Sequence, residues 1–149
     1  MKSSRVLKLT LLAIPLLAFT GCGGDGIQYV EVEGTVQQDG KPLERILVEF
    51  WPEGNGSRSI GETDANGHFV LATDDGKRKG ASVGSHKVIL KDSALHGDKF
   101  LGRAGEHVDM SQGRKPRISD KLANPETTSL SQKVEAGKKN SVTIEAAKK

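Results

Sequence analysis

The sequence contains a single cysteine, Cys22, so no disulfide can form within the chain. Tyrosine and tryptophan each occur once, and aromatic residues make up only 4% of the chain. Long hydrophobic runs are also missing, since the main apolar stretch extends only from Leu9 to Phe19. A membrane-spanning helix needs about 20 apolar residues. The composition therefore excludes an intramolecular disulfide scaffold and falls short of a bilayer-spanning segment.

Acidic and basic residues balance once the start of the chain is set aside. The whole sequence has 22 Lys and Arg against 19 Asp and Glu. Lys2, Arg5 and Lys8 precede Cys22 and no acidic residue does, which leaves 19 residues of each sign in the remainder. A neutral chain lacks the basic surface that nucleic-acid binding requires, and we expect no nucleic-acid partner.

Residues 1–21 have the organisation of an export signal. Basic residues precede the apolar stretch, and small residues stand just before Cys22, as in secretory signal peptides that are cleaved from the mature protein. Residues 17–22 resemble the lipobox of bacterial lipoproteins, although Phe19 replaces the usual aliphatic residue. Two alternatives stay open: an uncleaved membrane helix, which would contain Pro15, and a soluble secreted product.

The lipobox resemblance implies that the thiol of Cys22 carries a diacylglycerol and its amino group a further acyl chain such as palmitate. Two or more acyl chains hold a protein stably on a bilayer, whereas one gives marginal binding. We therefore expect a lipid-anchored protein of the cell envelope that faces the periplasm or the exterior. Residues 22–28 are glycine-rich and predict a lipidated flexible spacer. Residues 29–146 have the length of one domain.

Alternation of apolar and polar residues predicts that this domain is built from β-strands. Glycine-containing turns separate the alternating segments, for example Asp39-Gly40 and Asn66-Gly67. No convincing amphipathic helix appears, so we expect a single antiparallel β-sandwich of seven or eight strands. Strands are expected near residues 30–36, 46–52, 59–63, 68–71, 84–91, 117–119, 130–134 and 142–144.

Five segments carry a likeness to a known family, namely residues 32–36, 39–43, 48–53, 63–69 and 124–130. They resemble the carboxypeptidase regulatory-like, or transthyretin-like, domain of small bacterial envelope lipoproteins. The resemblance implies an all-β fold, a single antiparallel seven-stranded Greek-key sandwich that serves as a binding or stabilising module. Because the shared elements are turns, glycines and apolar positions, they bear on the fold and hardly on an activity.

Catalytic motifs of related sandwiches do not occur in the sequence. Residues 145–149 differ from the Tyr-Arg-Gly-Ser ending of transthyretin-like hydroxyisourate hydrolases. Intradiol dioxygenases bind iron through two tyrosines and two histidines, and Tyr29 is the one tyrosine here. Neither a Gly-x-Ser-x-Gly elbow nor a His-Glu-x-x-His zinc motif is present. We expect no enzymatic activity and no cofactor.

Residues 92–116 form the least regular part of the sequence. Connections longer than about 12–15 residues are uncommon in compact domains and tend to be functional or disordered. A metal ion could meet side chains here, but their spacing matches no established metal signature, and a solvated irregular loop accounts for the segment without one. The candidate ligands are His96, Glu106, His107 and Asp109.

Two further polar positions receive structural interpretations. His86 shares the apolar face of its predicted strand, and we expect it to be a hydrogen-bonded residue at the core edge rather than a ligand. Residues 62–67 place oxygen-bearing side chains in the register of an EF-hand loop. Thr73 then stands where a bidentate glutamate is required, so a plain β-turn is expected.

The sequence as a whole predicts a non-enzymatic interaction or structural module, with the sheet edges and residues 92–116 as contact surfaces. A carbohydrate or small-ligand binding protein is the alternative. Trp51 is its candidate contact, because alternation points this side chain away from the face of Phe50. The partner, an envelope protein or a polysaccharide, is not identified by the sequence.

Overall fold

Strands dominate the chain, as the alternation predicts. The computed structural model describes residues 26–96 and 115–148. Its helical content within these ranges is a four-residue helix, α1 (Ser93–His96), and one 3-10 turn, η2 (Asp120–Ala123). The strands are β1 (Tyr29–Val30), β2 (Val32–Gln38), β3 (Lys41–Pro42), β4 (Ile46–Pro52), β5 (Ser59–Glu62), β6 (His68–Val70), β7 (Ala72–Thr73), β8 (Ala81–Ser82), β9 (Gly84–Asp92), β10 (Ser131–Val134) and β11 (Asn140–Glu145).

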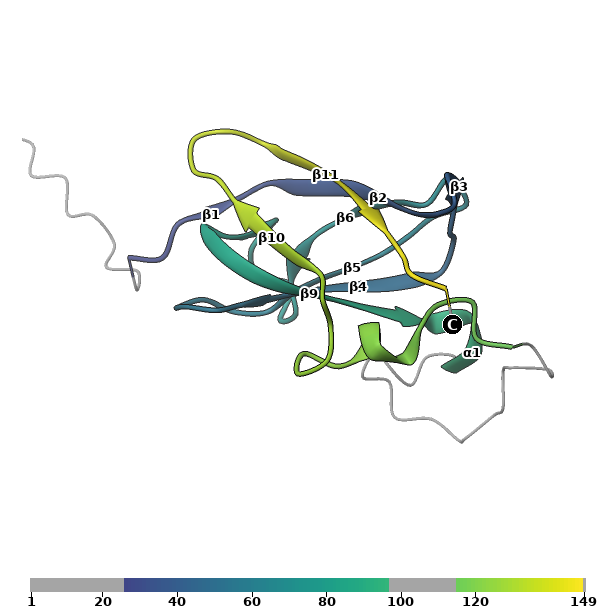
Figure 1. Cartoon of the computed structure of the whole chain (residues 1–149). Helices are drawn as coiled ribbons and strands as arrows, with labels where there is room; N and C mark the ends of the chain where they lie inside the picture. The colour runs from purple at the N-terminus through teal and green to yellow at the C-terminus, as the bar shows by residue number, and fades with distance from the viewer. Residues whose placement is uncertain (1–25, 97–114, 149) are drawn as a thin grey trace, which may run out of the picture.

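Two sheets pack face to face, with β2 and β11 above β4 and β9 in the view of Figure 1. One sheet has the order β10-β9-β4-β5-β7. In the other, β2 pairs with β11 on one edge and with β3 and β6 on the opposite edge. β1 and β8 form a separate two-stranded ladder. The fold of the described residues is therefore all-β and two-layered.

The core lies between the two sheets, because the strands turn most of their apolar side chains inward. In β4 the inward positions are Ile46, Val48 and Phe50, all fully buried. Burying side chains of this size contributes about 1.5–3 kcal/mol each. Side chains from the same sheet and from the facing sheet complete the core: Val32, Val36, Phe69, Leu71, Val88, Leu90, Val134, Val142 and Ile144.

Two details differ from the sequence-based expectation. β11 runs parallel to β2, with Asn140 opposite Val32, whereas the remaining ladders are antiparallel. The parallel pair arises because β10 lies at the edge of one sheet and the following turn carries β11 across to the other sheet. Seven of the described strands have three or more residues and four have only two. The weak strand expected at residues 117–119 is reduced to one bridge, between Ile118 and Lys148.

The turn after β5 is held by its own aspartate. Asp64 Oδ1 accepts hydrogen bonds from the backbone N–H groups of Asn66 at 2.8 Å and His68 at 2.9 Å. These bonds, that from His68 first, lower the pKa of Asp64. Gly67 completes the turn with a φ of 72°, which glycine adopts without strain. The geometry of a β-turn thus accounts for the polar residues of this segment.

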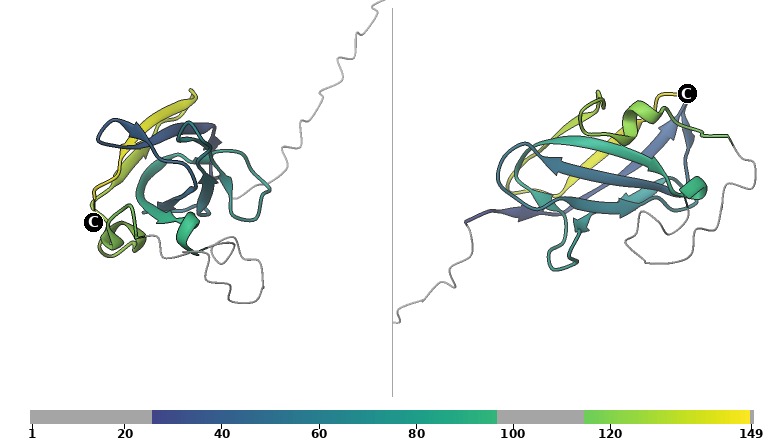
Figure 2. Two further views of the ribbon diagram at one scale, coloured as in Figure 1. Left: turned by 90° about the vertical axis from the view of Figure 1, so that its right-hand side faces the viewer. Right: turned by 90° about the horizontal axis from the view of Figure 1, so that it is seen from below.

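The first strand and the C-terminal residues lie at opposite ends of the molecule. β1 lies at one end of the sandwich, and α1 and the C-terminal residues lie at the other (Figures 1 and 2). Among residues 26–96 and 115–148, no helix is long and apolar enough to cross a bilayer.

Candidate functional site

The outer face of the five-stranded sheet carries a buried carboxylate. Along β4, alternation sends Leu47, Glu49 and Trp51 to the side opposite Phe50. Glu49 lies between Ile60 of β5 and Ile89 of β9 in the register of the sheet. Its side chain is only 3% exposed. A charge this buried is tolerated only when it is paired and hydrogen-bonded.

Three donors satisfy the Glu49 carboxylate. Lys91 Nζ donates to Oε1 at 2.6 Å, and the indole N–H of Trp51 donates to Oε2 at 2.7 Å. Arg58 lies 3.5 Å from Oε2, and its guanidinium stands 5.5 Å from the centroid of the Trp51 ring. Because Leu47 is the register partner of Lys91, the Lys91 to Glu49 pair spans a diagonal of the sheet. This cluster joins four side chains, and Arg58 also pairs with Asp74 at 3.2 Å, so that two carboxylates face the two cations.

Trp51 lies on the face opposite Phe50, as alternation predicts. Phe50 is fully buried, whereas Trp51 is partly exposed. Its register partner on β9 is Lys87, whose Nζ donates to the carbonyl of Pro125 at 2.9 Å. Trp51 therefore stands between two cations, Arg58 and Lys87, on a polar surface. Both cations already have oxygen partners, since Arg58 pairs with Glu49 and Asp74 and Lys87 bonds to Pro125.

A serine and a histidine meet beneath the β1 end of the molecule. Ser82 Oγ lies 3.2 Å from His86 Nε2, and His86 Nδ1 lies 3.1 Å from the carbonyl oxygen of Gly84. Because a carbonyl only accepts, Nδ1 carries the proton and the neutral ring accepts from Ser82 through Nε2. Burial lowers the pKa of His86, against the opposing effects of the Gly84 hydrogen bond and the charge of Glu53.

Ser82 and His86 are hydrogen-bonded as a nucleophile and its base would be, but a substrate cannot reach the hydroxyl of Ser82. Ser82 is fully buried and His86 is 1% exposed. Gly56 covers the serine so closely that a Cβ on it would lie 2.5 Å from Ser82 Oγ. No substrate carbonyl could approach the hydroxyl in this arrangement. The prediction that His86 is a hydrogen-bonded residue at the core edge is confirmed.

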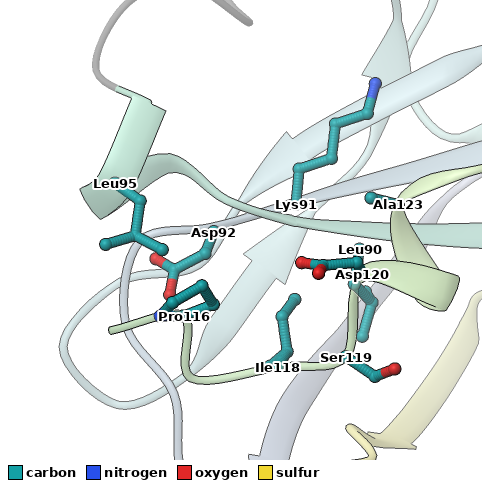
Figure 3. A pocket seen from close by; sticks show the side chains of 9 residues that line it. All are labelled: Leu90, Lys91, Asp92, Leu95, Pro116, Ile118, Ser119, Asp120 and Ala123. Atoms are coloured by element: carbon teal, nitrogen blue, oxygen red, sulfur yellow. The ribbon is translucent and has the colours of Figure 1, made fainter. Parts of the chain in front are cut away.

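A small hollow lies at the opposite end, beside α1 (Figure 3). Its volume is about 160 Å³, well below the roughly 300–1,000 Å³ of typical ligand pockets. The lining is mainly apolar, with the side chain of Asp120 directed toward the space and that of Lys91 directed away (Figure 3). The lining residues are Leu90, Lys91, Asp92, Leu95, Pro116, Ile118, Ser119, Asp120 and Ala123.

Several predicted site residues lie outside the described residues. Cys22, Glu106, His107 and Asp109 are among them, and His96 is the last residue of α1. Across the part of the chain that the structure describes, no three His, Cys, Asp or Glu side chains are grouped to hold a metal ion. The proposed lipid and metal positions thus stay predictions.

Comparison with known proteins identifies no relative. No family model, no curated protein and no solved structure matches the chain.

The sequence did not predict the two polar clusters, although it contains a partial signal for one of them. Glu49 is an acidic residue in the middle of an apolar strand, which indicates that it needs a cationic partner. The sequence does not show which strands lie beside this one, so the partner could not be identified.

Proposed function

We propose that this protein is a lipoprotein of the bacterial cell envelope, anchored through an acylated Cys22, whose domain acts as a non-enzymatic interaction or structural module. The domain is proposed to be a transthyretin-like Greek-key sandwich of the carboxypeptidase regulatory-like type. The all-β, two-layered architecture and the seven longer strands support that assignment.

The position of β1 carries the proposal. The step from Cys22 to Ile27 is five residues, and a fully extended chain of that length spans at most about 18 Å. An anchor at Cys22 would hold the β1 end close to the bilayer. The opposite end, which carries α1 (Figure 1), would then face away from the membrane and be free to meet a partner. The hollow beside α1 lies at this end (Figure 3).

The polar clusters support a binding role over a catalytic one. Ser82 is closed off by Gly56, and the Glu49 carboxylate is engaged by three donors. Catalytic groups must reach the reacting atoms of a substrate, and neither of these groups does. Both clusters instead stabilise the sheets on which a contact surface would be built.

Mass spectrometry of the protein from native membranes tests the anchor. We expect an N-terminal Cys22 bearing a diacylglyceryl group and an amide-linked acyl chain, and a Cys22→Ser variant that is released from the membrane fraction. A free thiol together with an intact Met1 would overturn the proposal.

Site-specific photocrosslinking tests the orientation. A crosslinking amino acid at the exposed Asp120, near the hollow, should capture a defined envelope protein. The same probe at the exposed Asn55, near β1, is the matched control and should not capture that protein. Equal capture from both positions, or capture from Asn55 alone, would contradict the proposed orientation.

A carbohydrate-binding function is the second candidate, and the setting of Trp51 between Arg58 and Lys87 supports it. Retarded migration of the protein in gels that contain an acidic polysaccharide tests it. Trp51→Ala should abolish the retardation, and Trp51→Phe should retain part of it because a ring remains. Unchanged migration of both variants would rule Trp51 out as the contact.

A further inference from the structure

The ladder of β1 and β8 is one of three described ladders with only two residue pairs, and it is the first that the chain meets after the predicted anchor. It pairs Tyr29 with Ser82 and Val30 with Ala81. The backbone N–H of Val83 extends it with a 2.9 Å bond to the carbonyl of Gln28. Two-stranded ladders this short are marginal on their own. Other contacts must therefore keep β1 in place.

Val30 packs against the hydrophobic core, and Tyr29 is held by contacts from two loops. The backbone N–H of Ser57 donates to the hydroxyl of Tyr29 at 2.8 Å. The guanidinium of Arg78 stands 4.6 Å from the centroid of the Tyr29 ring. Both contacts are at the surface, where they are worth little individually. Gly56 closes the assembly by packing on Ser82.

Ser82 links this assembly to the buried histidine. Its backbone pairs with Tyr29, and its side chain bonds to His86. The closed arrangement of β1, β8 and residues 56–57 therefore covers a neutral imidazole. A protonated His86 would donate through both ring nitrogens, so the hydroxyl of Ser82 would have to accept from Nε2 instead of donating to it.

The groups around His86 do little to favour its charged form. Its register neighbours, Pro52 on β4 and Gln132 on β10, do not titrate. Phe50 lies with its ring centroid 5.7 Å from the imidazole. Among the described residues, the carboxylate of Glu53, beyond Pro52, attracts the proton, and its effect is smaller than the cost of burial. Lys133 on β10 is opposite Ser85, one position along β9.

We propose that β1 is a latch on the sandwich that opens when His86 takes up a proton. Opening lets water reach the imidazole, so the open form binds the proton more tightly than the closed form does. Above pH about 6.5, the ordinary pKa of histidine, the latch stays closed. Below it, the open population grows by up to about tenfold per pH unit until the closed form protonates as well.

The latch has a consequence that rests on the proposed lipid anchor. Releasing residues 27–30 from the sandwich adds at most about 14 Å to the reach of the chain that follows Cys22. The domain would then stand farther from the bilayer in a mildly acidic compartment. The latch itself does not depend on lipidation, so its test and the test of the anchor can fail separately.

Amide hydrogen exchange by NMR tests the latch on residues 22–149 without lipid. Protection of Val83 and Ser57, corrected for the intrinsic exchange rate, should fall by up to about fivefold from pH 6.5 to pH 5.5. Val36, which donates to the carbonyl of Gly67 at the far end, should keep its protection. A parallel loss at all three amides would show global unfolding and overturn the proposal.

Two variants assign the effect to His86. His86→Gln keeps a donor and an acceptor but does not titrate, and should remove the pH dependence at Val83 and Ser57. His68→Gln, at an exposed histidine beside Glu33, is the control and should leave it unchanged. Persistence of the pH dependence in His86→Gln would overturn the latch.

A second measurement covers the case in which His86→Gln does not fold. Titration of the His86 ring resonances in the unchanged protein should give a midpoint that coincides with the loss of protection at Val83. Separate midpoints would overturn the coupling between the proton and the latch.

Discussion

Arg117 holds Asp92 through two parallel hydrogen bonds, with Nε 2.8 Å from Oδ2 and Nη2 2.6 Å from Oδ1. Asp92 ends β9 and is 3% exposed, whereas Arg117 lies beyond residues 97–114 in the sequence and is 32% exposed. Asp92 first, and Glu44 to a smaller extent, raise the pKa of Arg117, with burial opposing them. The pair joins the two ends of the irregular segment at the end of the molecule away from β1.

Replacing Arg117 is predicted to destabilise the fold more than breaking a surface ion pair. Arg117→Ala leaves the buried carboxylate of Asp92 without its bidentate partner and should lower the free energy of unfolding by about 2–3 kcal/mol. Arg117→Lys should cost less, because one charge remains but the paired geometry is lost. Denaturant unfolding measures both. The control is Lys138→Ala, which breaks an exposed pair with Glu135 and should cost less than about 1 kcal/mol. Equal losses of stability in Arg117→Ala and Lys138→Ala would contradict the prediction that the pair of Arg117 and Asp92 stabilises the fold more than a surface ion pair does.

Neutralising Glu49 is predicted to weaken the five-stranded sheet. Glu49→Gln keeps the shape of the side chain but removes the negative charge that Lys91 and Arg58 share, while Arg58 keeps its ion pair with Asp74. The cost should be about 1–2 kcal/mol. Fluorescence of Trp51, the one tryptophan, reports the unfolding transition directly beside the substitution. Glu53→Gln changes an exposed carboxylate just after the same strand and serves as the control. A Glu49→Gln variant as stable as Glu53→Gln would show that the cluster contributes nothing net.

The strand positions could be predicted from the sequence because alternation depends only on which side of a strand faces the core. Phe69 and Leu71 are buried and Val70 is 58% exposed, as the pattern indicated. The direction of β11 could not be predicted, since Val142 and Ile144 alternate in the same way beside a parallel or an antiparallel neighbour. The prediction of a wholly antiparallel sandwich was therefore wrong at this one pair.

The polar clusters could not be predicted from the sequence because they, like the direction of β11, depend on which strands are neighbours. Lys91 is 42 positions from Glu49 in the sequence, and the two meet only because β4 and β9 are neighbours. Ser82 and His86 are close in sequence, but their bond depends on the bend at Val83 that separates β8 from β9. Sequence patterns give the face of a residue, whereas such clusters require the order of strands in the sheet.

Asp75 is predicted to titrate far below an ordinary aspartate. The hydroxyl of Thr73 donates to its Oδ1 at 2.6 Å, and this bond, followed by that from the Lys77 backbone, lowers the pKa of Asp75 to about 2. The resulting stabilisation is complete above the ordinary pKa of 3.8 and is lost as the pH falls through about 2. Thr73→Val removes the hydroxyl and should raise the pKa toward 3.8, as followed by NMR titration of the carboxyl carbon. An unchanged midpoint would assign the shift to the backbone bond instead.

Two glycines with similar φ angles distinguish the effect of backbone strain from the effect of steric overlap at the latch. Gly56 has a φ of 139° and Gly84 a φ of 134°, so alanine is strained at either position. A Cβ would meet Ser82 only at Gly56, since nothing lies within 4 Å of that at Gly84. Backbone strain should lower the free energy of unfolding by about 1–3 kcal/mol in both variants. In Gly56→Ala the steric overlap with Ser82 should lower it by about 1–3 kcal/mol more.

The same two variants distinguish a loosened latch from a weakened fold. Gly56→Ala should release Ser57 and Val83 from protection at neutral pH, because the overlap with Ser82 forces residues 56–57 away from β1 and β8. Gly84→Ala strains a strand of the main sheet and should lower protection across the core, Leu90 included. If Gly56→Ala lowers protection at Leu90 as much as at Val83, residues 56–57 are part of the cooperative core, and β1 is not a separately opening element.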